Sequence, residues 1–173
     1  HLGHSQMNSQ SELAKQKPYV PISIYDAFTA VPYSGSQAAI VLNASDISIQ
    51  NRVLIAREIG APATGFVSAI NHNRIKVQFF STVMELPMCG HGTVCLITHL
   101  VAQELLPCAG HGWQKAVLDL PKGEAMVECR QTKAGRVDVM LDVTEARFAT
   151  VNFNLAELAG ILGVGVGHIS NEL

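Results

Sequence analysis

A thiol and two glycines stand immediately before a long apolar run, and this arrangement constrains the fold more than any other stretch. The segment Leu86-Pro87-Met88-Cys89-Gly90-His91-Gly92-Thr93 leads into an apolar run from Val94 to Leu106, which ends at Pro107. A strand is expected just before it, over 74–80. The pattern therefore predicts a buried helix over 92–106, which the chain enters through a tight strand-to-helix turn.

The start of this predicted helix carries the strongest candidate chemistry in the sequence. The first backbone N–H groups of a helix have no partners within it, and the helix dipole makes that end positive. Because glycines let a ligand approach the backbone, the amides of Gly90, His91, Gly92 and Thr93 are predicted to bind a carboxylate or phosphate. The same field is expected to lower the pKa of Cys89 toward the thiolate, a nucleophile or base. The alternative is that Cys89 is a small buried hydrophobe.

Composition narrows the range of partners. The chain has 173 residues, of which 48% are hydrophobic and 15% charged, as in a globular protein with a real core. Its net charge is −2 and it has no basic run, so neither nucleic acid nor an anionic membrane is an expected partner.

No apolar run reaches the roughly 18–20 residues that cross a bilayer, and residues 1–17 lack the apolar centre of a signal peptide. A cytoplasmic location is expected, and the irregular spacing of the four cysteines favours free thiols.

Alternating apolar residues and turn residues predict strands over most of the chain. The segment 71–73 is a turn between two strands, which together form a hairpin. Short turns also separate three later strands, so the pairing is mostly antiparallel and the class is α+β. The predicted strands are 19–28, 38–42, 64–70, 74–80, 114–120, 124–130 and 136–141.

Three helices are predicted. The first begins at Ser48 and ends near Glu58, the second is the apolar run over 92–106, and the third follows a cap at Asn154 over 155–162. Most of the apolar face of the first helix comes from four residues, Ile49, Val53, Leu54 and Ile55.

Three stretches together resemble the superfamily of phenazine-biosynthesis PhzF-like isomerases, diaminopimelate epimerase and proline racemase. Residues 25–35, followed by 38–42, look like the opening of PhzF-like proteins. Residues 56–67 look like their first helix and following strand, and residues 77–93 look like the signature shared with proline racemases. The resemblance runs in order over residues 19–162.

The resemblance implies a fold and a chemistry. The fold is a diaminopimelate epimerase-like half, hot-dog-like, with an antiparallel sheet wrapped around a central helix. Members of the superfamily carry two such halves, bind substrate between them, and use no cofactor. They move a proton on a carbon beside a carboxylate. Racemases and epimerases use one thiol from each half, whereas PhzF-like isomerases use a glutamate of the first half.

The sequence departs from this pattern in three places. The glutamate of PhzF-like isomerases falls at Ala63. Ser36-Gln37 stands where the family turn usually has Asn-Pro, so that Ser36 is the altered polar contact to substrate. The resemblance extends over only the first of the two halves, so a chain with one half is expected. The expected organisation is a mobile leader with tag residues over 1–17, a half domain over 18–150, and a connector helix and tail over 151–173.

Cys89 is the candidate acid or base, and the amides from Gly90 to Thr93 are the candidate donors to the charge that develops on the substrate. The Thr93 hydroxyl either caps the helix or binds the carboxylate. His91 either bonds the ligand or holds the turn. Glu85 is a substitute acid or a solvated loop carboxylate.

The Asp26 carboxylate is expected to accept hydrogen bonds from turn amides near Ser34 and Gly35. His91, Cys95 and His99 share one helical face, but their spacing matches no compact zinc motif, so no metal is predicted.

The function predicted from these residues is that of a cofactor-independent isomerase or epimerase acting on a small carboxylate. A non-catalytic module that binds a small metabolite is one alternative, and a truncated remnant of a two-half enzyme is another. A lone half would expose a broad apolar surface. A homodimer that imitates the two-half arrangement is therefore expected.

Overall fold

The computed structural model describes residues 19–108, 112–142 and 154–169. The chain divides into two units, 1–142 and 143–173, which are described separately. Residues 1–17, predicted to be a leader, lie outside the described residues. No helix in the described part of the chain is long and apolar enough to cross a membrane.

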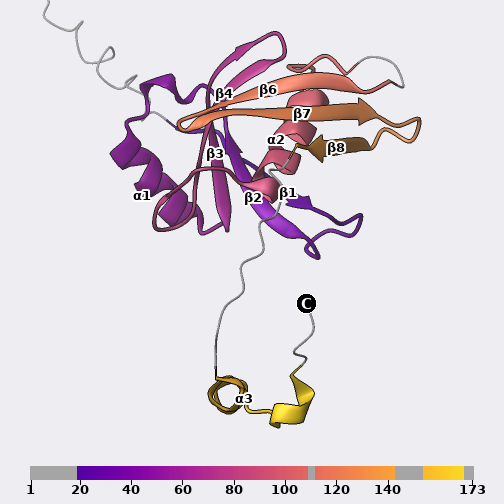
Figure 1. The fold of residues 1–173 in the computed structure, drawn as a ribbon. Helices are drawn as coiled ribbons and strands as arrows, with labels where there is room; N and C mark the ends of the chain where they lie inside the picture. The colour runs from indigo at the N-terminus through magenta and orange to yellow at the C-terminus, as the bar shows by residue number, and fades with distance from the viewer. Residues whose placement is uncertain (1–18, 109–111, 143–153, 170–173) are drawn as a thin grey trace, which may run out of the picture. The chain divides into compact units, whose positions relative to one another are not determined.

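The first unit is a mixed α+β fold built on a curled, half-barrel sheet (Figure 1). The strand order is β1-β2-β3-β4-β6-β7-β8, with the short β5 paired to β4. Every predicted strand is confirmed, with ends that differ by a few residues. The bounds are Ser23–Ala27 for β1, Ser36–Val41 for β2, Ala63–Asn71 for β3, Arg74–Phe80 for β4, Glu85–Leu86 for β5, Gln114–Leu120 for β6, Gly123–Gln131 for β7 and Val137–Leu141 for β8.

The sheet is not antiparallel throughout, which corrects the expectation from the resemblance. The β3–β4 hairpin and the β6–β7–β8 meander are antiparallel as predicted. However, β2 runs parallel to β3, and β4 runs parallel to β6. Parallel neighbours need a long crossover, usually a helix. The helices α1 (Ile49–Ile59) and α2 (Gly90–Ala102) lie in these two connections.

The helix α1 begins and ends where its capping residues predict. Ser48 is the N-cap, and its Oγ accepts a hydrogen bond of 3.3 Å from the Asn51 N–H. Gly60 ends the helix in the left-handed conformation, with φ of 73°, which glycine adopts without strain.

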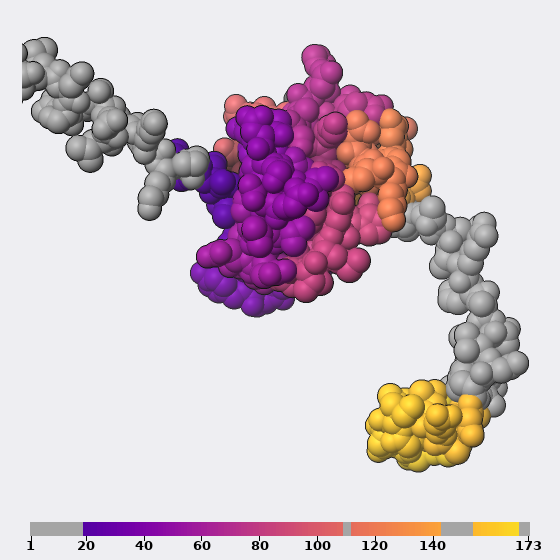
Figure 2. Space-filling view, turned by 90° about the vertical axis from the view of Figure 1, so that its left-hand side faces the viewer, coloured from indigo at the N-terminus to yellow at the C-terminus, as the bar shows by residue number. Residues whose placement is uncertain are grey.

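The predicted apolar face of α1 is only partly correct. Val53 and Ile55 pack against the core cluster on this side of the sheet, but Leu54 is 55% exposed and Ile49 is also exposed. The buried residues of the helix are Arg52 and Ala56. Figure 2 views the first unit from the side on which α1 lies.

The apolar run after Cys89 does form a buried helix, but α2 starts two residues before the prediction and ends four residues before it. After Ala102 the backbone turns sharply at Glu104, whose φ is 57°. The N–H groups of Leu105 and Leu106 then both donate to the Leu100 carbonyl. Leu106 is buried although it is not helical. At the C-terminal end of the run, the apolar residues therefore predicted burial correctly but did not predict where the helix ends.

The helix α2 contacts β1, β2 and β3 on one side and β8 on another, and most of its residues are buried (Figure 1). His99 is its buried polar residue near β1, where Nδ1 lies 3.0 Å from the Tyr25 hydroxyl. Burial lowers the pKa of His99 and raises that of Tyr25. The neutral imidazole can therefore accept a hydrogen bond from the protonated phenol.

The second unit contains α3 (Leu155–Leu162), as predicted. Asn154 caps it, because its Oδ1 accepts hydrogen bonds from the N–H groups of Ala156 and Glu157. Gly163 ends the helix with φ of 67°, and a short 3₁₀ turn follows at Val166–His168.

Candidate functional site

Cys89 is the N-cap of α2 and holds the turn through its backbone. Its carbonyl accepts hydrogen bonds from the Thr93 N–H at 2.9 Å and from the Thr93 hydroxyl at 2.8 Å. Thr93 is fully buried. The hydroxyl therefore donates to the backbone carbonyl of the N-cap residue and does not cap the helix, whose start has no side-chain cap.

Cys89 is 6% exposed, and its thiol lies 3.5 Å from Nδ1 of His91. Burial raises the pKa of Cys89, and a hydrogen bond from the Gly92 backbone opposes the rise only in part. The prediction of a lowered pKa was wrong. The loss of water around the sulfur outweighs the favourable end of the helix.

Gly92 allows close packing around this sulfur. A Cβ at position 92 would lie 3.0 Å from Cε1 of Phe79 and 3.1 Å from Sγ of Cys89. The phenyl ring of Phe79 also lies against Gly65 of β3. One aromatic side chain thus supports both the start of α2 and the neighbouring strand.

Strand register brings the predicted site residues to one edge of the sheet. Ser36 begins β2, and Ala38 pairs with Ala63 at the start of the parallel β3. Phe79 and Phe80, at the end of β4, pair with β5, which leads into Cys89. Ala63 is fully buried and belongs to the same core cluster as Cys89. This edge therefore presents buried apolar groups beneath the turn and no carboxylate at position 63.

Glu85 is neither free nor fully solvated. It is half-buried in β5, and its Oε1 accepts a hydrogen bond of 2.9 Å from Nε2 of Gln78. The Oε1 of the same Gln78 accepts from the guanidinium of the buried Arg52. A polar chain thus runs from α1 across the sheet to the strand before Cys89. The sequence showed no signal for it, because these residues are far apart in the chain.

The remaining candidates take structural positions. Asp26 binds the β1–β2 turn as expected, although its Oδ2 accepts from the Tyr33 N–H, at 2.8 Å, rather than from Ser34 or Gly35. Cys95 points its thiol at the Tyr25 carbonyl. Among the residues that the structure describes, no three potential ligands gather as a metal site would require.

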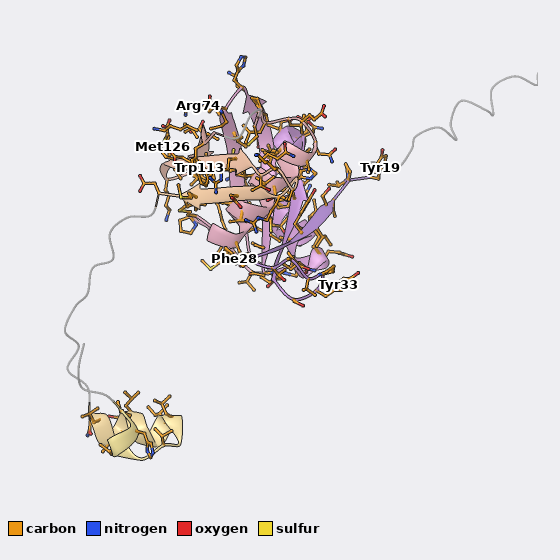
Figure 3. All side chains as sticks on the ribbon, turned by 90° about the vertical axis from the view of Figure 1, so that its right-hand side faces the viewer. Tyr19, Phe28, Tyr33, Arg74, Trp113 and Met126 are labelled. Atoms are coloured by element: carbon orange, nitrogen blue, oxygen red, sulfur yellow. The ribbon has the colours of Figure 1, made fainter. Side chains whose placement is uncertain are left out.

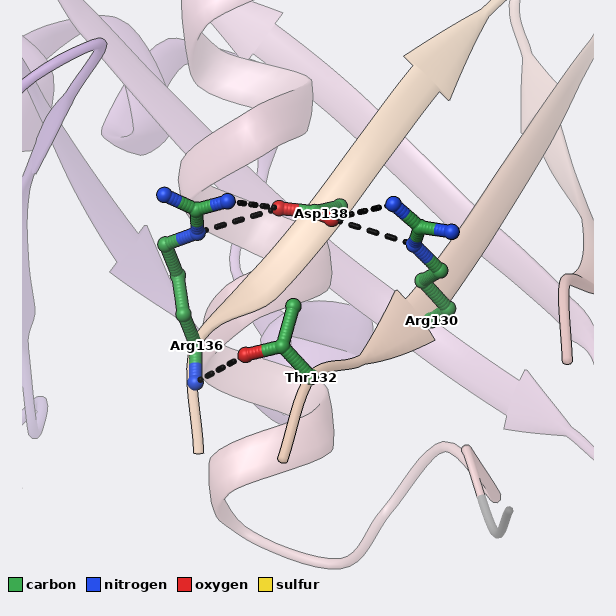
Figure 4. A network of polar contacts seen from close by, with 4 residues as sticks. All are labelled: Arg130, Thr132, Arg136 and Asp138. Carbon is green, nitrogen blue, oxygen red and sulfur yellow. Dashed lines mark hydrogen bonds and ion pairs between the residues drawn. The ribbon is translucent and has the colours of Figure 1, made fainter. Parts of the chain in front are cut away.

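A cavity of about 680 Å³, whose lining does not include Cys89, lies between the β1–β2 turn, α2 and β8. On its rim, Asp138 accepts hydrogen bonds from Nε of Arg130 and Nε of Arg136, both at 3.1 Å (Figure 4). The hydrogen bond from Arg130 is the main cause of the lowered pKa of Asp138. Arg130 also lies over the ring of Trp113, 4.6 Å from its centroid. All three of these charged side chains are therefore engaged in contacts within the protein.

Comparison with known proteins finds a matching family and solved structures that share this fold. Residues 25–168 match the family described as phenazine biosynthesis-like protein, PhzC-PhzF. The chain belongs to this family. A family member from Bacillus anthracis, a PhzF-family phenazine biosynthesis protein, has a crystal structure that superposes with a TM-score of 0.74 at 27% identity. A predicted epimerase from Pseudomonas aeruginosa shares the fold, with a TM-score of 0.72 at 18% identity.

The family resemblance covers only part of each relative. The uncharacterized isomerase YddE of Escherichia coli K12 is 36% identical over 81 residues, which are 47% of this chain and 27% of YddE. The uncharacterized isomerase YfhB of Bacillus subtilis is 26% identical over 81% of this chain and 46% of its own length. The B. anthracis superposition covers 86% of this chain and 48% of that one. The chain therefore spans about half the length of these family members.

Proposed function

We propose that this chain forms one half of a cofactor-independent isomerase-type site for a small carboxylate. The observation that carries the proposal is the position of Cys89 and the amides that follow it at the edge shared with Ser36 and position 63. The Gly92 amide donates to the thiol. The Gly90 and His91 amides are the first two of α2, where no carbonyl of the helix itself can accept from them. Free amides at a helix start suit an anion.

In this proposal the substrate carboxylate lies against the amides of Gly90 and His91. Cys89 takes or returns the proton on the adjacent carbon, and His91, 3.5 Å away, accepts the thiol proton. The amides stabilise the negative charge that develops as the C–H bond breaks. Inversion at carbon needs a second acid on the opposite face, which a second half or a second copy of the chain would provide.

A binding module without catalysis is the second candidate. Two observations favour it. Ala63 leaves no carboxylate where the PhzF-like isomerases carry theirs, and burial raises the pKa of the Cys89 thiol. A protonated thiol is a poor base, whereas the amides at the start of α2 bind an anion in any case.

Exchange of the α-proton in deuterated water separates the two candidates. With a panel of amino and hydroxy acids, the isomerase predicts exchange detectable by NMR, and Cys89→Ser should reduce its rate by about 100-fold or more. Cys95→Ser is the matched control, because this buried thiol of the same helix contacts the Tyr25 carbonyl instead. Binding without exchange supports the module. If no acid in the panel binds or exchanges, both candidates are wrong.

We also expect two copies of the chain to associate through the edge that carries Cys89. The β1–β2 turn at this edge exposes Phe28 and Tyr33, the latter 96% exposed (Figure 3). Light scattering should give twice the chain mass of 18.6 kDa. Tyr33→Ser together with Phe28→Ser should return it to the single mass, whereas Met126→Ser on the strand β7 should not. A single mass for the unmodified chain would exclude this pairing.

A further inference from the structure

The sulfurs of Cys108 and Cys129 lie close together. Cys108 follows the C-terminal end of α2, whereas Cys89 stands at its start. The thiol of Cys108 donates to Sγ of Cys129, and the two sulfurs lie 3.7 Å apart. Both residues are buried and both thiols are free. Nothing in the proposed function uses either one.

The two thiols differ in their surroundings. Cys108 lines a small cavity of about 170 Å³, together with residues of the α2 C-terminal turn and Gln131. It lies outside any helix or strand. Cys129 lies within β7, paired on both sides with Gln114 and Val139, and is fully buried. Burial, and then the neighbouring Cys108, raise the pKa of Cys129 to about 12.

We propose that Cys108 and Cys129 are a redox modification site, at which a peroxide-class oxidant converts the two thiols into a disulfide. The 3.7 Å between the sulfurs must shorten to about 2.05 Å, a shift that rotation of the Cys108 side chain can supply. The other two cysteines are differently engaged. Cys89 lies beside His91, and Cys95 donates to the Tyr25 carbonyl.

The reaction balances with hydrogen peroxide alone. The Cys108 thiolate attacks one peroxide oxygen, the O–O bond breaks, and hydroxide leaves, so that Cys108 becomes a sulfenic acid. The sulfur of Cys129 then attacks the sulfur of Cys108, the S–O bond breaks, and the oxygen leaves as water with the Cys129 proton. The hydroxide takes up the proton that Cys108 lost. In total, two thiols lose two electrons and peroxide becomes two waters.

The order of attack follows from the environment of each thiol. The cavity beside Cys108 is large enough for a water-sized oxidant. Cys129 is fully buried, and it stays protonated until the sulfenic acid stands next to it. The resulting bond ties the segment after α2 to β7. This link restrains the C-terminal end of α2.

Peptide mapping of the full chain tests the site. After treatment with hydrogen peroxide, free thiols are blocked with a maleimide and the digest is analysed by mass spectrometry. We expect one intramolecular link between the Cys108 and Cys129 peptides, two blocked thiols in place of four, and full reversal by dithiothreitol. In Cys129→Ser the link is lost, and Cys108 is trapped as sulfenic acid by dimedone.

Two variants keep this test decisive. Cys95→Ser should leave the yield of the link unchanged, because that thiol is engaged elsewhere. Cys108→Ser should abolish both the link and the dimedone adduct, and its thermal unfolding midpoint, unlike that of the parent chain, should no longer rise on oxidation. A link through Cys89 or Cys95, a disulfide between two chains, or four unreacted thiols would each overturn the proposal.

Discussion

Replacing Phe79 by alanine is expected to lower the free energy of unfolding by about 3–5 kcal/mol, as for other buried phenylalanines. Phe79 is fully buried, and its ring fills the space left by Gly65 on β3 and Gly92 on α2. Its removal leaves a cavity that neither glycine can fill. Urea unfolding followed by circular dichroism measures the loss.

The same substitution should also loosen the turn at Cys89. Because the Phe79 ring packs on Gly92, the Cys89 thiol should react faster with a thiol reagent in Phe79→Ala than in the parent chain. Phe79→Leu is the control, since it keeps most of the volume and should lose no more than about 1.5 kcal/mol. A loss below that value in Phe79→Ala would show that the ring does not support this junction.

Replacing Arg52 by alanine is expected to cost about 3 kcal/mol or more. Its guanidinium is buried and donates to the carbonyls of Ala44 and Ile47 and to the side chains of Gln78 and Ser68. Each buried acceptor that loses its donor costs on the order of 1–3 kcal/mol. Chemical denaturation of the variant measures the sum.

Two further variants of α1 show whether this cost comes from the hydrogen bonds. Arg57→Ala, on the exposed side of the same helix, should change stability by no more than about 0.5 kcal/mol. Arg52→Lys keeps the charge but not the planar fork of donors, so it should recover only part of the loss. An Arg52→Ala variant as stable as Arg57→Ala would refute the role given to this network.

Structural features that depend on contacts between near neighbours in the chain were predictable from the sequence. The caps at Ser48 and Asn154 and the turn at 71–73 depend on hydrogen bonds within a few residues, and all three are present. The apolar run after Cys89 predicted burial correctly. It misplaced the end of the helix, because Leu106 is buried by the turn at Glu104 and not by helical packing.

The candidate site was predictable as a set of residues but not as an electrostatic environment. The helix start at Cys89 was identified, yet the expected fall in its pKa is a rise. The sign depends on how much water reaches the sulfur, which the packing of Phe79 and Gly92 decides. The contacts of Arg52 join residues 44, 47, 68 and 78, and no local pattern marks them.

By itself the sequence determined which segments form helices and strands, to within a few residues at their ends, because backbone capping and side-chain alternation act between near neighbours. It also determined the family, through residues kept in order along the chain. Only the tertiary structure decided which strands run parallel, that Arg52 is buried, and that Cys108 meets Cys129. These outcomes depend on desolvation and on contacts between residues far apart in the chain, which exist only once the sheet has curled and the helices have packed against it.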